Sequence, residues 1–323
     1  MVREQTTWIG VRVGDCLIED RIADGRFSSV YRGTKLAGSS RKAFKVAKSS
    51  DVTDPGAGRS QWATAALTIF EGGVTPVRPD SHQILAFQGH KLEACNDPAL
   101  PTVEEMVSGE GLSYFRMEFL PGQSLRQLLR LGQASIKTFL EIARALARLH
   151  ENPAFGYHGD LKPDNILVSP SGVRLLDPGY FGKLDCQEGR DLTCAITTPG
   201  YYPFMEPDDL FALGIMLWES VCRQHPLVGT GDSRAEKVTA KLQSWVQSYE
   251  NVGQYFLSPI LRLRRPSELV PGIPPEVEQV LLTGMRLSLD QTGRLERAPG
   301  FQRFTDLAES LEPLLGWHVN GSQ

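Results

Sequence analysis

The first third of the chain alternates apolar and polar residues in short runs that glycine and serine interrupt. A period of two is typical of β-strands that bury one face. The first three runs predict antiparallel strands, and two later runs predict further strands before Pro121-Gly122 breaks the chain. The five predicted strands cover residues 16–22, 29–33, 42–47, 103–107 and 113–118.

The segment between the third and fourth predicted strands has a different pattern. Residues 49–60 are rich in Ser, Asp and Gly and predict a loop. Residues 61–71 predict a short helix that Gly72-Gly73 would end, and residues 74–80 are interpreted as another connection.

Residues 81–95 predict a longer helix, because four of their side chains share one helical face. Gln88 lies on this otherwise apolar face, so we expect it to point inward. The other members of the face are Leu85, Leu92 and Cys95.

Two further helices are expected after Pro121. Ser135 can cap a helix that ends before Pro153, and residues 210–218 are apolar on all sides, which predicts a helix buried inside a helical domain. The inward stripe of the first of these helices is Phe139, Ile142, Leu146 and Leu149.

The change from strands to helices predicts an α+β chain with two parts. A small β-rich part would cover residues 1–120, and a larger helical part would cover residues 121–323.

Composition narrows the classes of function. The chain is 41% hydrophobic with a net charge of −4, and its Lys and Arg residues are scattered, so we expect neither a nucleic-acid nor a membrane partner. The longest strongly apolar stretch, residues 210–218, is too short to span a bilayer. Five scattered cysteines without a Cys-x-x-Cys pair fit a reducing cytosol, so a cytoplasmic protein is expected.

One loop carries most of the candidate chemistry. It reads His158-Gly159-Asp160-Leu161-Lys162-Pro163-Asp164-Asn165, and Asp177-Pro178-Gly179 follows. The fixed positions are those of the pattern His-x-Asp-x-Lys-x-x-Asn followed by Asp-x-Gly. Six such positions at this spacing would coincide by chance about once in a hundred thousand sequences.

These residue types suit phosphoryl transfer, which needs an acceptor oxygen held in line and negative charge neutralised. Asp160 would accept or orient the proton of a substrate hydroxyl, and Lys162 can reach the transferring phosphate. Asn165 and Asp177 offer the hard oxygen ligands that Mg²⁺ prefers.

The chain resembles the protein kinase superfamily, in particular bacterial-like Ser/Thr kinases, from about residue 15 to about residue 315. In addition to the catalytic loop, residues 22–30 resemble the glycine-rich loop that covers the nucleotide, with Ala23 and Ser28 in place of two glycines. Ala43-Phe44-Lys45 is similar to the motif whose Lys holds the α- and β-phosphates.

The resemblance implies a two-lobed kinase fold with ATP and Mg²⁺ as cofactors. It also implies that residues 117–122 form the hinge between the lobes, with Met117 behind the adenine and backbone hydrogen bonds from Glu118 and Leu120. The nucleotide-contacting residues implied in this way are Ile22, Ala23, Gly25, Phe27, Val30, Ala43, Lys45, Met117, Glu118, Leu120 and Leu167.

The implied activity is a Ser/Thr protein kinase, with Asp160, Lys162 and Lys45 as catalytic residues and a protein hydroxyl as the acceptor. Two alternatives stay open. One is a pseudokinase that binds nucleotide or regulates other proteins, and the other is a small-molecule kinase of the aminoglycoside-phosphotransferase type, whose catalytic loop also opens with His-Gly-Asp.

By the resemblance, residues 81–95 correspond to the regulatory helix of kinases, and this helix departs from the family pattern. Gln88 stands where related kinases have a Glu that pairs with the third-strand Lys, so we expect a neutral bond from Lys45, worth about 1 kcal/mol against roughly 1.5–3 for a charged one. On this interpretation, restoring Glu at position 88 leaves activity equal or higher.

Other departures concern control. Gly159 stands where many kinases have an Arg that binds a phosphate group on the activation segment. Pro178 stands where the usual motif has a Phe. A phosphorylation switch is therefore less expected, and Thr193, Thr197 and Thr198 are interpreted as ordinary loop residues. By the same resemblance, Asp209 would brace the backbone of the catalytic loop.

Overall fold

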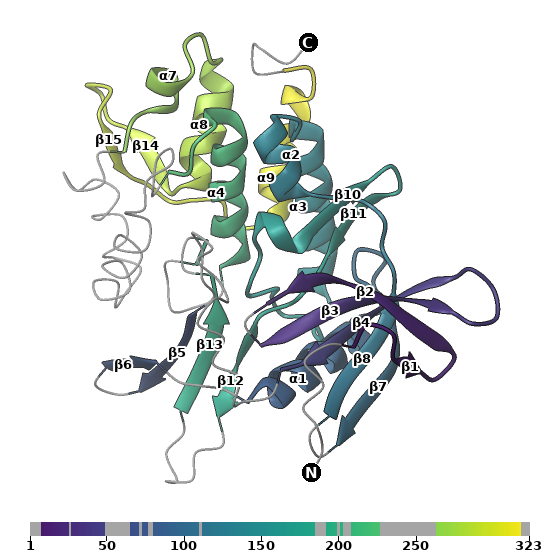
Figure 1. The fold of residues 1–323 in the computed structure, drawn as a ribbon. Coiled ribbons are helices and arrows are strands. Elements are labelled where there is room, and N and C mark those ends of the chain that lie inside the picture. Colours follow the sequence, from purple (N-terminus) through teal and green to yellow (C-terminus); the bar gives the residue numbers. More distant parts are fainter. Residues whose placement is uncertain are drawn as a thin grey trace.

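The alternating runs near the start of the chain form a six-stranded antiparallel sheet in the computed structural model (Figure 1). The structure describes residues 8–25, 27–48, 65–70, 73–76, 80–109, 112–184, 192–198, 201–202, 208–226 and 263–317. The strand order is β1-β2-β3-β4-β8-β7. The strands are β1 (Arg12–Val13), β2 (Cys16–Asp24), β3 (Ser28–Lys35), β4 (Arg41–Ala47), β7 (Val103–Gly109) and β8 (Leu112–Glu118), which confirms the five predicted strands.

Both faces of this sheet are covered. Phe44 and Tyr114 belong to a small apolar cluster on one face, whereas Ala43 and Phe115 join the main core on the other. Helix α1 (Ser81–Cys95) packs against β4, β7 and β8, and it begins at Asp80, whose side chain accepts from the backbone N–H of His82. The predicted helix is confirmed, and Gln88 lies on its buried face as expected.

The segment before α1 differs from the prediction. Strands β5 (Ala65–Phe70) and β6 (Gly73–Pro76) occupy the positions predicted as a short helix and a connection, so both predictions were wrong there. β5 pairs with β13 (Leu192–Thr197), which pairs in turn with β12 (Tyr180–Leu184). This non-local pairing satisfies the backbone groups of β5 and overrides weak local preferences. The loop predicted over residues 49–60 lies outside the described residues.

The second part of the chain is mainly helical. The predicted cap is confirmed: Ser135 accepts from the backbone N–H of Thr138 at 3.3 Å and begins the helix that leads to the catalytic loop. The helices are α2 (Leu125–Leu131), α3 (Ile136–Glu151), α4 (Asp209–Cys222), α7 (Pro266–Leu269), α8 (Pro275–Gly284) and α9 (Phe304–Leu311), with short 3₁₀ turns η1 (Pro163–Asn165) and η2 (Glu312–Leu314).

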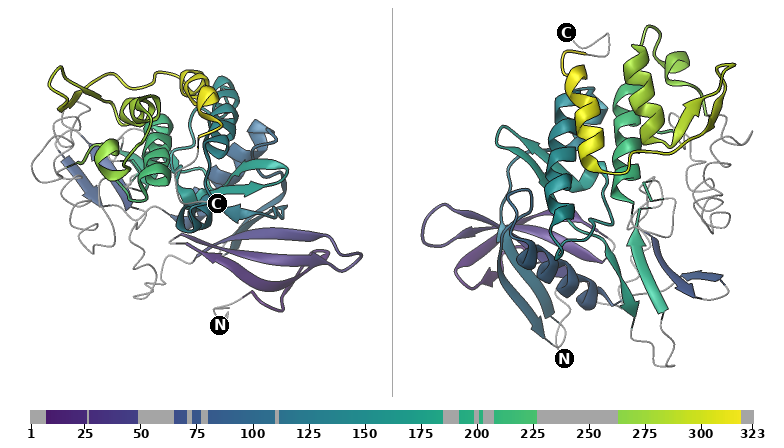
Figure 2. Two further views of the ribbon diagram at one scale, coloured as in Figure 1. Left: turned by 90° about the horizontal axis from the view of Figure 1, so that it is seen from above. Right: turned by 180° about the vertical axis from the view of Figure 1, so that it is seen from behind.

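Helix α4 forms the centre of this part, as its apolar sequence predicts. Trp218 is fully buried, and α4 packs against α3 and α8 (Figure 2). A Cβ on Gly214 would lie 2.4 Å from the carbonyl oxygen of Gly284, so the two backbones approach too closely for a side chain there. This contact fixes α4, which carries Asp209 at its first residue.

Short strands lie beside the catalytic loop. β10 (Ile166–Ser169) follows η1 and pairs with β9 (Gln123–Ser124) and β11 (Gly172–Leu175), whereas β14 (Leu287–Leu289) pairs with β15 (Leu295–Arg297) near α8. The β9-β10-β11 sheet fixes both ends of the chain between Asn165 and Asp177.

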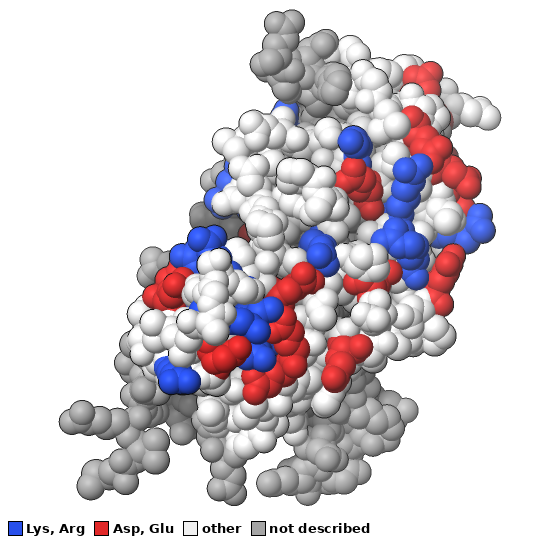
Figure 3. Space-filling view, turned by 90° about the vertical axis from the view of Figure 1, so that its right-hand side faces the viewer, with Lys and Arg blue, Asp and Glu red and all other residues white. Residues whose placement is uncertain are grey.

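The result is a two-lobed α+β fold, as the sequence predicts. The main apolar core extends from Ala43 and Phe115 in the sheet lobe to Leu146 and Trp218 in the helical lobe. Among the described residues, no helix is long and apolar enough to cross a membrane. Figure 3 shows one face of the molecule, on which acidic and basic side chains are intermixed.

Candidate active site

The catalytic loop connects α3 to η1, and the buried side chain of His158 braces it from inside. The amide of Asp160 donates to His158 Nδ1 at 3.3 Å, and His158 Nε2 lies 2.8 Å from the carbonyl oxygen of Leu176. Nε2 must therefore carry the proton and donate. Burial lowers the pKa of His158, so the ring is neutral and acts as a brace rather than a proton carrier.

Asp209 holds the start of the same loop. Its carboxylate accepts from the backbone N–H groups of His158 and Gly159, the latter at 2.9 Å, and from the hydroxyl of Tyr202. His150 Nε2 lies 3.0 Å away. Burial favours a raised pKa for Asp209, but hydrogen bonds from its neighbours outweigh burial and lower the pKa to about 2. The expected bracing role of Asp209 is confirmed by this geometry.

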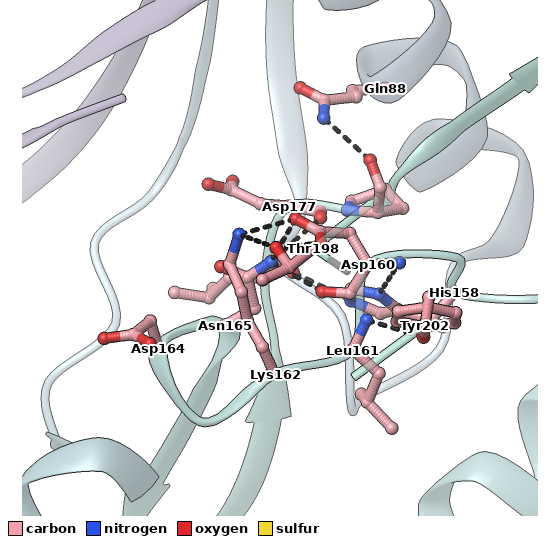
Figure 4. A network of polar contacts seen from close by, with 12 residues as sticks. Gln88, His158, Asp160, Leu161, Lys162, Asp164, Asn165, Asp177, Thr198 and Tyr202 are labelled. Carbon is pink, nitrogen blue, oxygen red and sulfur yellow. Dashed lines mark hydrogen bonds and ion pairs between the residues drawn. The ribbon is translucent and has the colours of Figure 1, made fainter. Parts of the chain in front are cut away.

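The buried side chains of Asp160 and Thr198 form a polar cluster with the partly buried Lys162 (Figure 4). Lys162 Nζ lies 2.7 Å from Asp160 Oδ2, and the Thr198 hydroxyl donates to Asp160 Oδ1 at 2.7 Å. Lys162 also donates to the Thr198 hydroxyl at 2.9 Å. Thr198 is fully buried, so its interpretation as an ordinary loop residue was wrong. Its position directly before Pro199-Gly200, in a stretch that resembles the end of the activation segment of kinases, was the available signal.

Asn165 and Asp177 also lie next to Asp160, and Asn165 Nδ2 is 3.2 Å from Asp160 Oδ2. Asn165 Nδ2 donates to the backbone carbonyl of Asp160 at 2.8 Å and to that of Asp177 at 3.3 Å. Because the amide nitrogen faces these carbonyls, the amide oxygen faces the opposite direction. Asp177 has a φ of +53°, a conformation that Asp tolerates better than most residues.

Lys45 reaches this cluster from the sheet. Strand β4 places it opposite Val30 on β3 and Phe115 on β8, and its side chain is almost completely buried. Lys45 Nζ lies 2.8 Å from Asp177 Oδ1. Burial would raise the pKa of Asp177, but the Lys45 ammonium lowers it below its ordinary value.

Gln88 connects α1 to both groups. Lys45 Nζ donates to Gln88 Oε1 at 2.7 Å, which confirms the predicted pair, and Gln88 Nε2 donates to the carbonyl of Pro178 at 2.7 Å. Sequence reasoning missed the second bond.

Two glycines let the metal motif, Asp177-Pro178-Gly179, approach the catalytic loop closely. The Gly179 amide donates to the His158 carbonyl at 2.7 Å, and a Cβ on Gly179 would lie 2.7 Å from the backbone of Gly159. Gly159 itself has a φ of +80°, which favours glycine.

The residues predicted to contact the nucleotide lie mainly on the β2–β3 pair, on the β4–β8 pair and on β10. Sheet register puts Ala23 opposite Val30, and Ala43 opposite Met117, which is buried. Leu167 comes from β10 in the helical lobe. Ile22, Ala23 and Gly25 are exposed, whereas Phe27, Leu120 and Leu167 are half-buried. Their common role in nucleotide binding stays a prediction.

Glu118 in the predicted hinge also has local partners. Its backbone N–H donates to the carbonyl of Thr102 at 3.0 Å, and its carboxylate accepts from Arg174 at 3.2 Å. These contacts tie the hinge to β11.

The donors at the site fit Mg²⁺. Asp177 supplies a carboxylate and Asn165 an amide oxygen, and Mg²⁺ is commonly held by one or two protein oxygens together with substrate phosphates and water. Among the described residues, no group of three or more His, Cys, Asp or Glu side chains could hold a metal ion.

Comparison with known proteins also indicates a protein kinase domain. The protein kinase domain family matches residues 90–292, more than half of the chain, and this range includes Asp160, Asn165 and Asp177 but not Lys45. The solved structure described as "PpkA-294 apo form" covers 94% of this chain and 98% of its own, with a TM-score of 0.54 and 17% identity, and so supports the fold.

Two relatives of known name are similar over most of the chain. The tyrosine-protein kinase MasK of Myxococcus xanthus is 26% identical over 271 residues, which cover 76% of this chain and 37% of MasK. A probable serine/threonine-protein kinase, PknB of Bifidobacterium longum, is 25% identical over 241 residues, 67% of this chain and 31% of PknB. This chain thus spans about a third of the length of these relatives.

Proposed function

Because this chain belongs to the protein kinase domain family, we propose that it transfers the γ-phosphate of Mg·ATP to serine or threonine hydroxyls of a protein substrate. The observation that carries the proposal is the polar cluster of Asp160, Lys162 and Thr198. The lobe boundary is proposed after Leu120, between the end of β8 at Glu118 and the start of β9 at Gln123.

In this proposal Asp160 receives the proton of the substrate hydroxyl or orients it. Lys162 and Thr198 hold the two carboxylate oxygens of Asp160, which restricts its rotation. A fixed carboxylate supports in-line attack because positioning is the main contribution that a protein makes to phosphoryl transfer.

The bound Mg·ATP would supply the phosphoryl group and neutralise charge on it. Asn165 and Asp177 would hold the metal, and Lys45 would pair with the α- and β-phosphates. Lys45 Nζ lies 2.8 Å from Asp177 Oδ1, so the proposed phosphate-binding ammonium and the proposed metal ligand are next to each other. The nucleotide base would lie against Val30, Ala43, Met117 and the other residues that the sequence predicts for this role.

The choice of serine and threonine over tyrosine rests on two features. Lys162-Pro163 follows Asp160, a pattern of Ser/Thr kinases, and the names of several relatives indicate that specificity. MasK, in contrast, is named a tyrosine kinase. The test must therefore identify whether serine, threonine or tyrosine is phosphorylated.

The test is incubation with Mg·ATP and either a panel of generic protein substrates or an aminoglycoside, followed by mass measurement of the products and phosphosite mapping of the proteins. Asp160→Ala should lower turnover by about 10²–10⁴-fold, because it removes the proton acceptor. Glu93→Ala, at an exposed carboxylate on α1, serves as the matched control and should leave turnover unchanged.

Three outcomes would contradict the proposal. Nucleotide binding without phosphate transfer would support a pseudokinase. Transfer to an aminoglycoside alone would support a small-molecule kinase, and phosphate found only on tyrosine would overturn the Ser/Thr specificity.

A further inference from the structure

Gln88 makes two hydrogen bonds of opposite sense at the centre of the site. Its amide oxygen accepts from Lys45 at 2.7 Å, and its amide nitrogen donates to the carbonyl of Pro178 at 2.7 Å. Figure 4 shows the second bond running from α1 to the chain beside Asp177. Gln88 is only 9% exposed, so water has little access to replace either partner.

The second bond depends on the chemistry of both residues. Proline has no backbone N–H, so the carbonyl is the only backbone hydrogen-bonding group that Pro178 can offer. A carbonyl needs a donor, and an ionised glutamate is an acceptor only. An amide at position 88 can therefore donate to the carbonyl of Pro178, which an ionised glutamate at that position cannot do.

Pro178 lies between two other fixed points of the metal motif. On one side, Asp177 pairs with Lys45 through Oδ1, and on the other, the Gly179 amide donates to the His158 carbonyl at 2.7 Å. Asp177 has a φ of +53°, which few non-glycine residues adopt without support. A bond to the Pro178 carbonyl holds the peptide that directly follows Asp177.

We propose that Gln88 is a positioning residue that fixes the metal-binding carboxylate of Asp177 by holding the carbonyl of Pro178. The role rests on the proposed function, since it assigns a support to the metal ligand of the same site. It also reverses an expectation from the sequence alone: Glu at position 88 would keep an acceptor for Lys45 but place a carboxylate oxygen against the Pro178 carbonyl. Restoring Glu should therefore impair the site.

The experiment compares three single variants by calorimetric titration of ADP with and without Mg²⁺. Gln88→Glu keeps the acceptor for Lys45 and loses the donor, whereas Gln88→Met loses both. Gln83→Glu makes the same change at an exposed position of α1 and is the matched control. The measured quantity is the ratio of the ADP dissociation constants without and with Mg²⁺.

We expect this ratio to fall at least about fivefold in Gln88→Glu and in Gln88→Met, and to stay unchanged in Gln83→Glu, because one hydrogen bond is worth about 1 kcal/mol. If Gln88 acts only through Lys45, Gln88→Glu will match the wild type, and that result overturns the proposal.

Amide hydrogen exchange in the nucleotide-free protein provides a second measurement. Gln88→Met should speed exchange of the Gly179 amide more than Lys45→Met, because only the former also removes the bond to Pro178. Equal exchange of the Gly179 amide in Gln88→Met and Lys45→Met overturns the proposal. This measurement does not use Gln88→Glu, so it decides the question even if Gln88→Glu does not fold. Neither measurement requires turnover. A wild type without kinase activity would therefore reject the proposed function, whereas the role of Gln88 would still be decided by the titration and by the amide exchange.

Discussion

The hydroxyl of Thr198 donates to Asp160 Oδ1 at 2.7 Å, although the two residues are 38 positions apart in the chain. The same hydroxyl accepts from Lys162 at 2.9 Å. The segment after β13 therefore carries part of the support of the catalytic loop, and a displacement of this segment would remove a bond from the proposed base.

Replacement of Thr198 tests this support. Thr198→Val keeps the shape and removes the hydroxyl, so kcat should fall about 10–100-fold because Asp160 loses a fixed hydrogen bond inside a buried site. Thr198→Ser keeps the hydroxyl and is the control, with kcat within about threefold of the wild type. Equal turnover in both variants would show that the hydroxyl does not position Asp160.

Replacement of Lys45 tests the phosphate contact. Lys45→Met should lower kcat/KM by at least about 10²-fold, because its charge would neutralise phosphate oxygens in the transition state. Lys137→Met, at a highly exposed lysine on α3, is the control in the same steady-state assay. Unchanged turnover in Lys45→Met would remove this residue from the proposed site.

Lys91 gives the protein a pH-dependent stability. It lies one turn beyond Gln88 on α1, donates to the Tyr157 carbonyl and stands over the rings of Phe155 and Tyr157, at 5.1 and 4.5 Å from their centroids. Burial lowers the pKa of Lys91 to about 8, although the Asp209 carboxylate acts in the opposite direction. Sequence reasoning did not single out this residue.

The sign follows from the number of protons bound. Below about pH 8 both the folded and the unfolded chain carry the proton on Lys91. Above it only the unfolded chain does, up to its ordinary pKa of 10.5, so folding becomes more favourable as the pH rises. The free energy of unfolding of the wild type relative to Lys91→Met should rise by about 2 kcal/mol from about pH 7 to about pH 9.5. Urea titrations of both proteins measure it, and a constant difference would contradict the lowered pKa.

The pairing of β5 with β13 should protect the segment that leads to Thr198. The double variant Ala66→Pro/Leu67→Pro removes two neighbouring backbone donors, one of which faces β13 in an antiparallel ladder. Loss of about 1 kcal/mol of pairing should speed amide exchange in residues 192–197 about fivefold. Ala66→Val/Leu67→Val keeps both donors and is the control, and equal exchange in the two double variants would show that β5 does not hold β13.

Elements whose signal is local could be predicted from the order of the amino acids alone. The period of two in residues 16–47 and the single apolar face of residues 81–95 report the burial of each element regardless of its partner. The loop from His158 to Asn165 is also local, because its residue types and their spacing follow from phosphoryl transfer. The two-lobed fold and the candidate residues of this loop could therefore be predicted.

Which groups meet from distant parts of the chain became known from the folded structure. Strand β5 forms because β13 supplies its backbone partners, Thr198 gains a role because it lies against Asp160, and Gln88 gains a second role because Pro178 is 90 residues away in the chain but 2.7 Å away in space. Periodicity shows that a side chain is buried and does not show what it is buried against. A hydrogen bond depends on that second fact, since donor and acceptor must meet at short range.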